Sequence, residues 1–289
     1  MTTRTTGQAV AFDAYWAALD RDVRAQAAGR VTLEELKMRS NESSTVYAAR
    51  FNGISGYPLF AYYSVPVGGG PFPALFEAPS YGSVRAVPAV ERRAKYVVMG
   101  ICHRGQRLSD GMYKSAYPGL LTEGLPGAGA YRWRDVVADC LRAFDVMAAR
   151  PEVDKSRIGV AGNDLAAIVA GLRPDVKCLL LNGQLLFRDT PARLTAGINY
   201  PLDEFNDFRR ANSGQWDEAA KTLALYDPIA FAPAITSETL IACLKGDAAV
   251  AEPLARAIKG KCELRVNSGK GFLDHEYQEE WLATRLLVK

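Results

Sequence analysis

One stretch of small and apolar residues sets a single carboxylate at a sharp turn. Residues 157–170 read Arg-Ile-Gly-Val-Ala-Gly-Asn-Asp-Leu-Ala-Ala-Ile-Val-Ala. The apolar start predicts a strand that ends near Ala161, and the small residues that follow Asp164 predict a helix. A strand, a turn and a helix with the spacing G-x-S-x-G form a nucleophile elbow, whose serine stands on a strained turn. Here Asp164 stands where the serine is expected, so the chemistry depends on that carboxylate.

Two further candidate residues follow strands later in the chain. In α/β-hydrolases the nucleophile, the acid and the histidine occur in that order, each on a loop after a strand. The apolar run 239–244 leads into Asp247, and the run 262–266 leads to His275 and a terminal helix. The chain has two histidines, and only His275 stands at the expected place. We therefore predict a triad of Asp164, Asp247 and His275.

Each of these features also has an ordinary structural explanation. An Asp at a strand-to-helix turn often caps the helix, and a Gly-Asp pair after a strand is a common turn. A single histidine near the C-terminus can be a surface residue. Their joint occurrence in this order, each after its own strand, favours an active site.

From Pro71 onward, the elements that would position these residues alternate between strands and helices. Short apolar runs predict strands at 73–76, 96–99, 158–161, 178–181, 239–244 and 262–266. The stretches between them predict helices at 85–94, 134–150, 164–172, 248–259 and 276–287. Such alternation predicts an α/β fold, with a mainly parallel central sheet and helices on both faces.

Two segments depart from this alternation. Before Pro71 we expect a helix over 12–28 and two antiparallel strands, over 44–52 and 57–66, in the outer part of the sheet. Residues 185–235 are rich in aromatic side chains, and we expect either an insertion over the active-site edge or a peripheral helix pair. The length favours a single domain over 1–289, with an N-terminal extension to about residue 70 and a cap-like insertion at about 185–235.

Composition narrows the class of protein. Lys and Arg number 35 against 32 acidic residues and are spread along the chain, which gives no support for nucleic-acid binding. The five cysteines are widely spaced, without a CxxC pair, which predicts buried thiols in a reducing compartment and neither disulfides nor zinc. No apolar stretch has the length of a signal peptide or a membrane span. We expect a cytoplasmic protein that acts on a small molecule without a metal or cofactor.

Several stretches carry a family resemblance: His103-Arg104-Gly105-Gln106, residues 131–139, 149–162 and 225–232, and His275-Glu276. Together they resemble the acetyl xylan esterase and cephalosporin C deacetylase group, the seventh family of carbohydrate esterases. The resemblance covers nearly the whole chain from about Phe12. It implies the α/β-hydrolase fold and a tendency to form homo-oligomers.

The resemblance also implies roles for individual residues. It assigns the nucleophile, the acid and the base to the same three positions that the chain order predicts. The backbone N–H groups of Leu165 and Tyr81 would form the oxyanion hole, which stabilises negative charge on a carbonyl oxygen. Arg104 and Gln106 would brace loops near the site.

The departures from the family pattern change the expected reaction. The family's Ser-Gln-Gly-Gly is here Asp164-Leu165-Ala166-Ala167, and its His-Gly before the tyrosine is Pro79-Ser80. A carboxylate that attacked an acetyl ester would have to form a high-energy anhydride and expel an alkoxide, which disfavours ordinary ester hydrolysis. A carboxylate does displace leaving groups from saturated carbon. His275, oriented by Asp247, would then activate water to release the product.

We therefore predict a hydrolase that forms an alkyl-enzyme ester on Asp164, similar in logic to haloalkane dehalogenases and epoxide hydrolases. Those enzymes usually have a tryptophan after the nucleophile, and fluoroacetate dehalogenases an arginine, where this chain has Leu165. In one alternative Asp164 is a general acid or base, as in a lyase or a hydrolase that uses water directly. In another the chain is an acetyl-ester hydrolase or deacetylase relative that is degenerate or has a substituted nucleophile. The covalent route requires the Asp164 carboxylate to face the cleft near His275.

Overall fold

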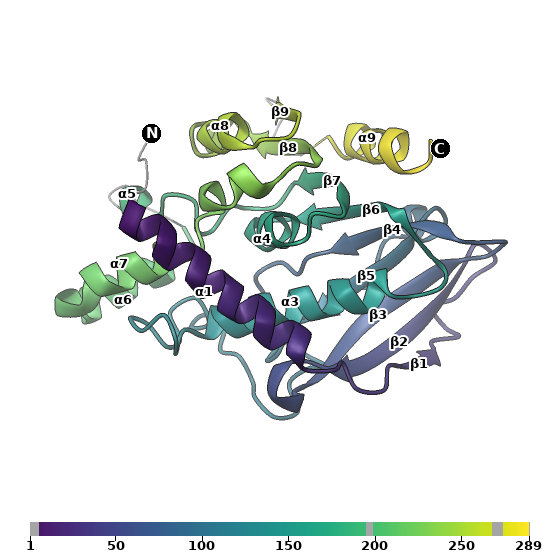
Figure 1. The fold of residues 1–289 in the computed structure, drawn as a ribbon, viewed down its shortest axis with the longest axis horizontal. Helices are drawn as coiled ribbons and strands as arrows, with labels where there is room; N and C mark the ends of the chain where they lie inside the picture. Colours follow the sequence, from purple (N-terminus) through teal and green to yellow (C-terminus); the bar gives the residue numbers. More distant parts are fainter. Residues whose placement is uncertain (1–5, 195–198, 268–273, 289) are drawn as a thin grey trace.

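A single mixed sheet organises the described part of the chain. The computed structural model describes residues 6–194, 199–267 and 274–288. Within these ranges the strands lie in the order β1-β2-β3-β5-β4-β6-β7-β8-β9 (Figure 1). Their bounds are β1 Thr32–Glu35, β2 Ser44–Asn52, β3 Pro58–Pro66, β4 Phe72–Glu77, β5 Val97–Cys102, β6 Val153–Gly162, β7 Val176–Leu181, β8 Glu238–Leu244 and β9 Cys262–Asn267.

The direction of the strands follows the sequence prediction. Strands β1, β2 and β3 pair antiparallel and form one edge, and β3 also pairs antiparallel with β5. The pairs from β5 through β4, β6, β7 and β8 to β9 are all parallel. The structure therefore confirms a mostly parallel sheet with antiparallel N-terminal strands.

Helices cover both faces of this sheet. They are α1 Thr6–Ala25, α2 Val90–Arg93, α3 Arg132–Ala148, α4 Asp164–Leu172, α5 Thr190–Arg193, α6 Asp203–Ala211, α7 Trp216–Ala224, α8 Ala248–Ala257 and α9 His275–Leu286. Side chains of α1, α3, α4 and α8 share one large apolar cluster, and α9 contributes to a separate cluster. Figure 1 shows α9 apart from the layer formed by α1, α3 and α4.

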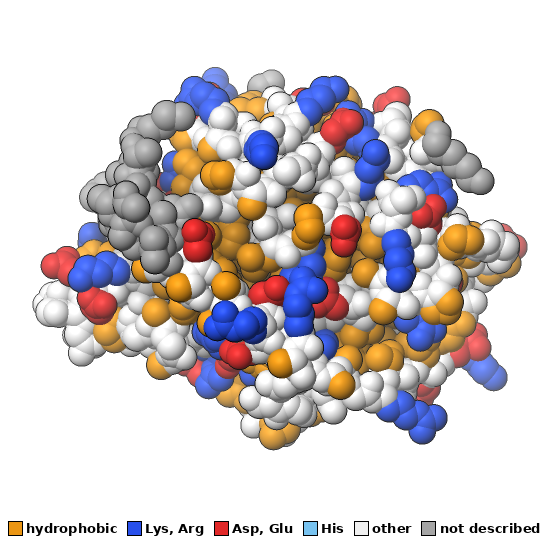
Figure 2. All heavy atoms as spheres, in the orientation of Figure 1, with side chains coloured by type: hydrophobic (Ala, Val, Ile, Leu, Met, Phe, Trp, Pro, Cys, Tyr) orange, Lys and Arg blue, Asp and Glu red, His pale blue; other side chains and the backbone are white. Residues whose placement is uncertain are grey.

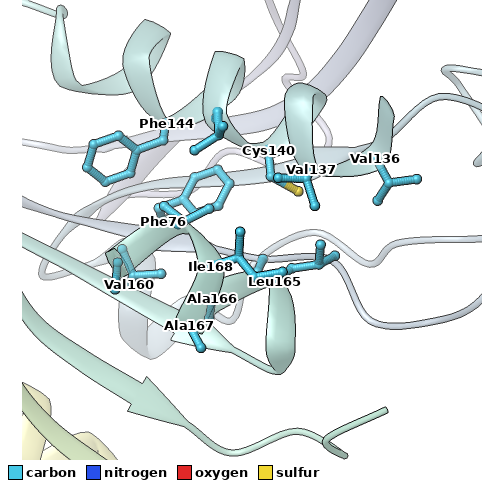
Figure 3. Packing of buried hydrophobic residues seen from close by; sticks show 14 of the residues in the cluster. Phe76, Val136, Val137, Cys140, Phe144, Val160, Leu165, Ala166, Ala167 and Ile168 are labelled. Atoms are coloured by element: carbon cyan, nitrogen blue, oxygen red, sulfur yellow. The ribbon is translucent and has the colours of Figure 1, made fainter. Parts of the chain in front are cut away.

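The two clusters arise because successive strand residues point to opposite faces. On β4, Phe76 belongs to the large cluster, whereas its neighbour Leu75 packs in the cluster that contains Trp281 of α9. Figure 3 shows Phe76 beneath α3, beside Phe144, and the two ring centroids are 5.9 Å apart. The same view shows Leu165 on the α4 side of this layer. The start of α4 is thereby anchored in the core.

Two local predictions differ from the structure. The helix expected over 85–94 is limited to α2, because Pro88 lacks an N–H donor and disfavours a helical residue before it. Strand β1 was not predicted, since Thr32-Leu-Glu-Glu35 is mostly polar and exposed at the sheet edge. Its pairing with β2 gives it extended structure in spite of that composition.

The segment between β7 and β8 holds α5, α6 and α7. Figure 1 shows α6 and α7 side by side at one end of the molecule, beyond the ends of the parallel strands. Trp216 of α7 and Phe205 of α6 pack against the large apolar cluster. The segment therefore has helices of its own and contacts the body of the protein.

Two surface observations agree with the composition. No helix within the described ranges is long and apolar enough to cross a membrane. On the face drawn in Figure 2, basic and acidic side chains are intermixed, without a broad area of one sign. This distribution gives no support for a nucleic-acid surface on that face.

Candidate active site

Two neighbouring cavities lie where the parallel strands end. The first, of about 400 Å³, is lined by Glu77, Gly162 and Asn182, at the ends of β4, β6 and β7. The second, of about 460 Å³, is lined mainly by residues at and just after the ends of β7 and β8. Residues 182–184 line both cavities. In open α/β sheets this edge is the usual place for ligand binding, and both volumes suit small molecules.

The turn between β6 and α4 is built around a glycine. Gly162 has a φ of 145°, a conformation that residues with a side chain rarely adopt. A Cβ atom there would lie 2.9 Å from Cβ of Ala78, at the end of the neighbouring β4. Gly162 therefore lets the ends of β4 and β6 approach closely beside the first cavity.

Asn163 occupies the corner of this turn and caps the helix. Its Oδ1 accepts a hydrogen bond of 3.1 Å from the Leu165 N–H, and its carbonyl accepts from Ala166 N at 2.9 Å. Asn is among the best N-cap residues, because its short side chain satisfies one of the unpaired N–H groups of the first turn. Asn163 also lines the first cavity.

Asp164 is the first residue of α4 and is fully buried. One carboxylate oxygen accepts from Leu186 N at 2.6 Å and the other from Phe187 N at 3.2 Å. Burial raises the pKa of the Asp164 carboxyl to about 7, although these two backbone donors act to lower it. The carboxylate thus ties the start of α4 to the segment after β7.

The structure buries Asp164, and its role as a nucleophile stays a prediction. Its side chain is 0% exposed and lines neither cavity, although the covalent route requires it to face the cleft. The physical reason is that Asn163 caps α4, so that the helix already begins at residue 164. Asn163, which precedes the helix, lines the first cavity, and Asp164, the first helical residue, is buried.

The oxyanion hole also differs from the prediction. The Leu165 N–H, one of the two expected donors, is already bonded to Asn163 Oδ1. Tyr81 lines the first cavity, as the second expected donor should. The Leu165 donor is therefore not free, because the cap residue occupies it.

Arg104 and Gln106 contact the segments around Tyr81 and the core. Gln106 Nε2 donates to Gly82 O at 2.7 Å, and its Oε1 accepts from His103 N at 3.1 Å. Arg104 makes two side-chain bonds to buried Asp139, of 2.9 and 2.7 Å. Gln106 thus links the loop of Tyr81 to the turn after β5.

Burial lowers the pKa of Arg104, whereas the Asp139 carboxylate raises it, and the net effect is a raised pKa.

The side chain of Tyr81 joins this loop to α6. Its hydroxyl donates to Glu204 Oε1 at 2.5 Å, while Gly119 N donates to the other carboxylate oxygen at 2.7 Å. Glu204 is 6% exposed, so losing the Tyr81 hydroxyl removes one of the few donors to a buried carboxylate. Burial raises the pKa of the Glu204 carboxyl, and burial together with the acceptor raises that of Tyr81.

Tyr81→Phe should lower the free energy of unfolding by about 1.5–3 kcal/mol, because it removes a buried hydrogen bond to a carboxylate. Urea denaturation at neutral pH measures the change. Tyr62→Phe is the matched control, because the half-buried Tyr62 of β3 makes no side-chain hydrogen bond within the described residues, and we expect a change within about 0.5 kcal/mol. Equal effects of the two substitutions would mean that the Glu204 contact does not stabilise the fold.

The second cavity contains the other two predicted triad residues. Asp247 and His275 both line it, with Arg193 and Cys243. Both are exposed, and no hydrogen bond between their side chains occurs in the described structure. His275 is the first residue of α9, whose N-cap Asp274 accepts from Tyr277 N. The structure thus brings Asp247 and His275 to one cavity, and leaves Asp164 out of it.

A charged cluster in the wall of the first cavity was not predicted. Glu77 pairs with Arg85 at 2.7 Å and with Arg92 at 2.9 Å, and Arg92 also pairs with Glu279. A Cβ on Gly100 of β5 would lie 2.5 Å from Arg85 Nε, so that glycine makes room for the guanidinium. No group of three His, Cys, Asp or Glu side chains placed to hold a metal occurs among the described residues.

Sequence reasoning named Asn163 only as a candidate N–H donor to a leaving group and did not assign it as the helix cap. The available signal was its type, because Asn directly before a helix is a preferred N-cap. With that assignment, residue 163 would have been placed at the corner of the turn and residue 164 inside the helix. Tyr200, in the segment between β7 and β8, also lines the first cavity, and the sequence offered it as one of several tyrosines that could act as an acid.

Comparison with known proteins supports the fold and the family. A curated relative, the acetyl esterase Axe7A of Xylanibacter ruminicola, is 22% identical over 247 residues. The alignment covers 80% of this chain and 55% of the relative, so the chain spans about half the length of that protein.

Two solved structures are similar to the chain over nearly its whole length. The acetyl xylan esterase from Paenibacillus sp. R4 has a TM-score of 0.79 at 23% identity, covering 99% of this chain and 96% of that one. Acetyl xylan esterase 1 from Thermoanaerobacterium sp. JW/SL YS485 has a TM-score of 0.77 at 21% identity, covering 96% and 92%. These likenesses confirm the α/β-hydrolase fold.

The sequence profile described as Acetyl xylan esterase (AXE1) matches residues 4–256. The match includes the turn at Asn163 and Asp164 and extends past Asp247, but it ends before His275. Because it covers most of the chain, it decides the family. The chain has the α/β-hydrolase fold, and it belongs to the acetyl xylan esterase family.

Proposed function

We propose that the chain is an acetyl-ester hydrolase relative with a substituted nucleophile, which hydrolyses a small ester with water that His275 activates directly. One observation carries this proposal. Asp247 and His275 line an open cavity, whereas the Asp164 carboxylate is sealed in the interior with both oxygens hydrogen-bonded. The base and its acid partner are thus accessible, and the residue at the nucleophile position is not.

The proposed reaction needs only groups that face the two cavities. His275 takes a proton from a water molecule while the water oxygen bonds to the ester carbonyl carbon. The tetrahedral oxyanion that forms is stabilised by the Tyr81 N–H at the first cavity. The bond to the alcohol oxygen then breaks, and His275 returns the proton to the leaving alcohol. An acid and an alcohol are released, and no bond to the enzyme forms.

The neighbouring cavities suit this arrangement. Asn182, Gly183 and Gln184 separate the first cavity, which holds Tyr81, from the second, which holds His275. An ester carbonyl at the edge of the first cavity would face water held on the His275 side of these three residues. Asp247 would orient the His275 ring and stabilise its protonated form.

The same burial weighs against the other reactions considered. An alkyl-enzyme ester on Asp164 needs its carboxylate in contact with the substrate, and a lyase that used Asp164 as acid or base would need that contact too. The carboxylate instead holds the Leu186 and Phe187 N–H groups. Breaking these bonds would leave two buried donors unpaired, at a cost of about 1–3 kcal/mol each.

Single-turnover hydrolysis of a small acetyl ester in heavy-oxygen water tests the proposal. With direct water attack the label enters the released acid, and the peptide that contains Asp164 stays unlabelled. Asp164→Asn should keep hydrolysis within about tenfold of the unaltered protein, because the carboxyl lines neither cavity and makes no contact with the substrate in this proposal. Label in the Asp164 peptide, or a loss of roughly 10⁴-fold in the variant, would instead identify Asp164 as the nucleophile.

Several features of the proposed protein stay predictions. The single-domain organisation, with residues 185–235 as a cap over the site, fits the Leu186, Tyr200 and Pro201 side chains in the first cavity. A cytoplasmic location and a homo-oligomeric state follow only from the cysteine pattern and the family resemblance. Gel filtration with light scattering would measure the oligomeric state.

A further inference from the structure

The carboxamide of Asn163 is the one polar side chain at the corner of the β6–α4 turn. It is 6% exposed, yet it lines the first cavity. Its Oδ1 is bonded to the Leu165 N–H, which fixes the orientation of the amide, because an N–H donor must face the oxygen. The Nδ2 group therefore points away from the helix.

This Nδ2 group is free to bind a ligand. It has no acceptor in the described part of the chain, and it is not among the buried polar atoms that lack a partner. It is thus reachable from the open space of the first cavity. A buried side chain with its oxygen anchored and its N–H₂ presented to a cavity is a positioned hydrogen-bond donor.

We propose that Asn163 is a catalytic residue whose Nδ2–H donates to the carbonyl oxygen of the bound ester and stabilises the oxyanion. This inference rests on the proposed hydrolytic function and adds a second donor to the Tyr81 N–H. The capping bond from Asn163 Oδ1 occupies the Leu165 N–H. The Nδ2 group of the same Asn163 side chain replaces that N–H as the donor in the cavity. Side-chain amides of Asn serve this role in other hydrolases.

The surroundings hold the amide in place before substrate arrives. A Cβ on Gly183 would lie 2.9 Å from the Asn163 Cβ, so the backbone after β7 packs closely against this side chain. The cap bond to Leu165 fixes the other side. Asn163 also stands at the N-terminus of α4, whose nine residues direct the positive end of their dipole toward it. A donor that needs no rearrangement stabilises developing charge best.

The two donors, Asn163 Nδ2 and the Tyr81 backbone N–H, define the class of ligand that can bind. An ester, an amide or a carboxylate presents a carbonyl oxygen with two lone pairs, which Asn163 Nδ2 and Tyr81 N would share. The released acid should bind the same two donors. We therefore expect acetamide, which carries the carbonyl but resists hydrolysis, to bind as a substrate analogue.

Two substitutions separate the donor role from the capping role. Asn163→Ser keeps a neutral N-cap and removes the amide donor, so we expect stability to be kept and kcat to fall roughly 10²- to 10³-fold. Asn163→Ala removes both, so kcat should fall similarly and the helix should also lose its cap. If Asn163 only caps the helix, Asn163→Ser will retain kcat, and the proposal is overturned.

A measurement on the unaltered protein covers the case in which the variants do not fold or no hydrolysis is detected. The side-chain amide signal of Asn163 in a ¹H–¹⁵N NMR spectrum should shift as acetamide is added. A shift supports Asn163 as the hydrogen-bond donor to the carbonyl oxygen. If the shift occurs without turnover, the proposed hydrolysis is contradicted and the role of Asn163 in binding is not. No shift at saturating acetamide, observed through other signals from the cavity, would overturn the assignment.

Discussion

The free energy of unfolding should fall by about 4 kcal/mol between pH 4 and pH 8 because of Asp164 alone. Its carboxyl is buried, and burial raises its pKa from 3.8 to about 7. The folded protein therefore holds this proton up to about pH 7, while the unfolded chain releases it near pH 4. Over that interval the folded state binds more protons, so stability decreases as pH rises. Each pKa unit corresponds to about 1.4 kcal/mol.

Asp164→Asn isolates this contribution. The variant has no titrating group at 164, so the difference in stability between it and the unaltered protein should change by about 4 kcal/mol across the same pH range. Urea denaturation at a series of pH values measures the difference. Other buried groups, such as His103, whose pKa burial lowers to about 4, cancel in the comparison.

A matched control is available on the surface. Asp207 on α6 is 68% exposed, so Asp207→Asn removes an acidic side chain from the surface and leaves the buried one in place. A difference for Asp164→Asn that does not change with pH would mean that the carboxyl is not sealed as the structure describes. The proposal that Asp164 is a structural residue would then lose its main support.

The arrangement at residues 163 and 164 explains how the family's elbow can keep its shape without a serine. Asn163 supplies the helix cap, and Asp164 supplies an acceptor for the backbone of the segment after β7. Both side chains stabilise the turn from which a nucleophile would otherwise project. Leu165 and Ala166 then pack into the core beneath α3. Position 164 thus has a structural role in this turn.

Most of the fold could be predicted because hydrophobic pattern determines it. The apolar runs at 178–181 and 239–244 lie within strands β7 and β8, and the helix expected over 164–172 has the observed bounds of α4. Buried strands and helices are recognised in this way because burial demands apolar side chains at a regular period. Strand β1 was missed because pairing at an edge, rather than burial, gives it its structure.

The site was predictable in position but not in orientation. Chain order correctly placed Asp247 and His275 after strands β8 and β9, where both reach one cavity. The direction of the Asp164 side chain depends on which residue starts α4, and a one-residue difference moves a side chain from cavity to core. Spacing within the motif carries no information about that choice. Contacts with residues 186 and 187, distant in sequence, settle it.

His275→Ala should lower kcat for a small acetyl ester roughly 10²- to 10⁴-fold, because it removes the base that activates water. Steady-state kinetics with the purified protein measures the loss. Stability should change little, since His275 is an exposed residue at the start of α9. Glu280→Gln, also exposed on α9, is the matched control and should keep full activity.

The partner substitution shows whether Asp247 acts through His275. Asp247→Asn should lower kcat less than His275→Ala does, because the ring remains but is no longer oriented by a carboxylate. The double variant should then be no less active than His275→Ala alone, since groups that act as a unit are not additive. Independent, multiplying losses would show that Asp247 contacts the substrate by itself. Full activity in His275→Ala would remove this histidine from the reaction and, with it, the proposed attack by water.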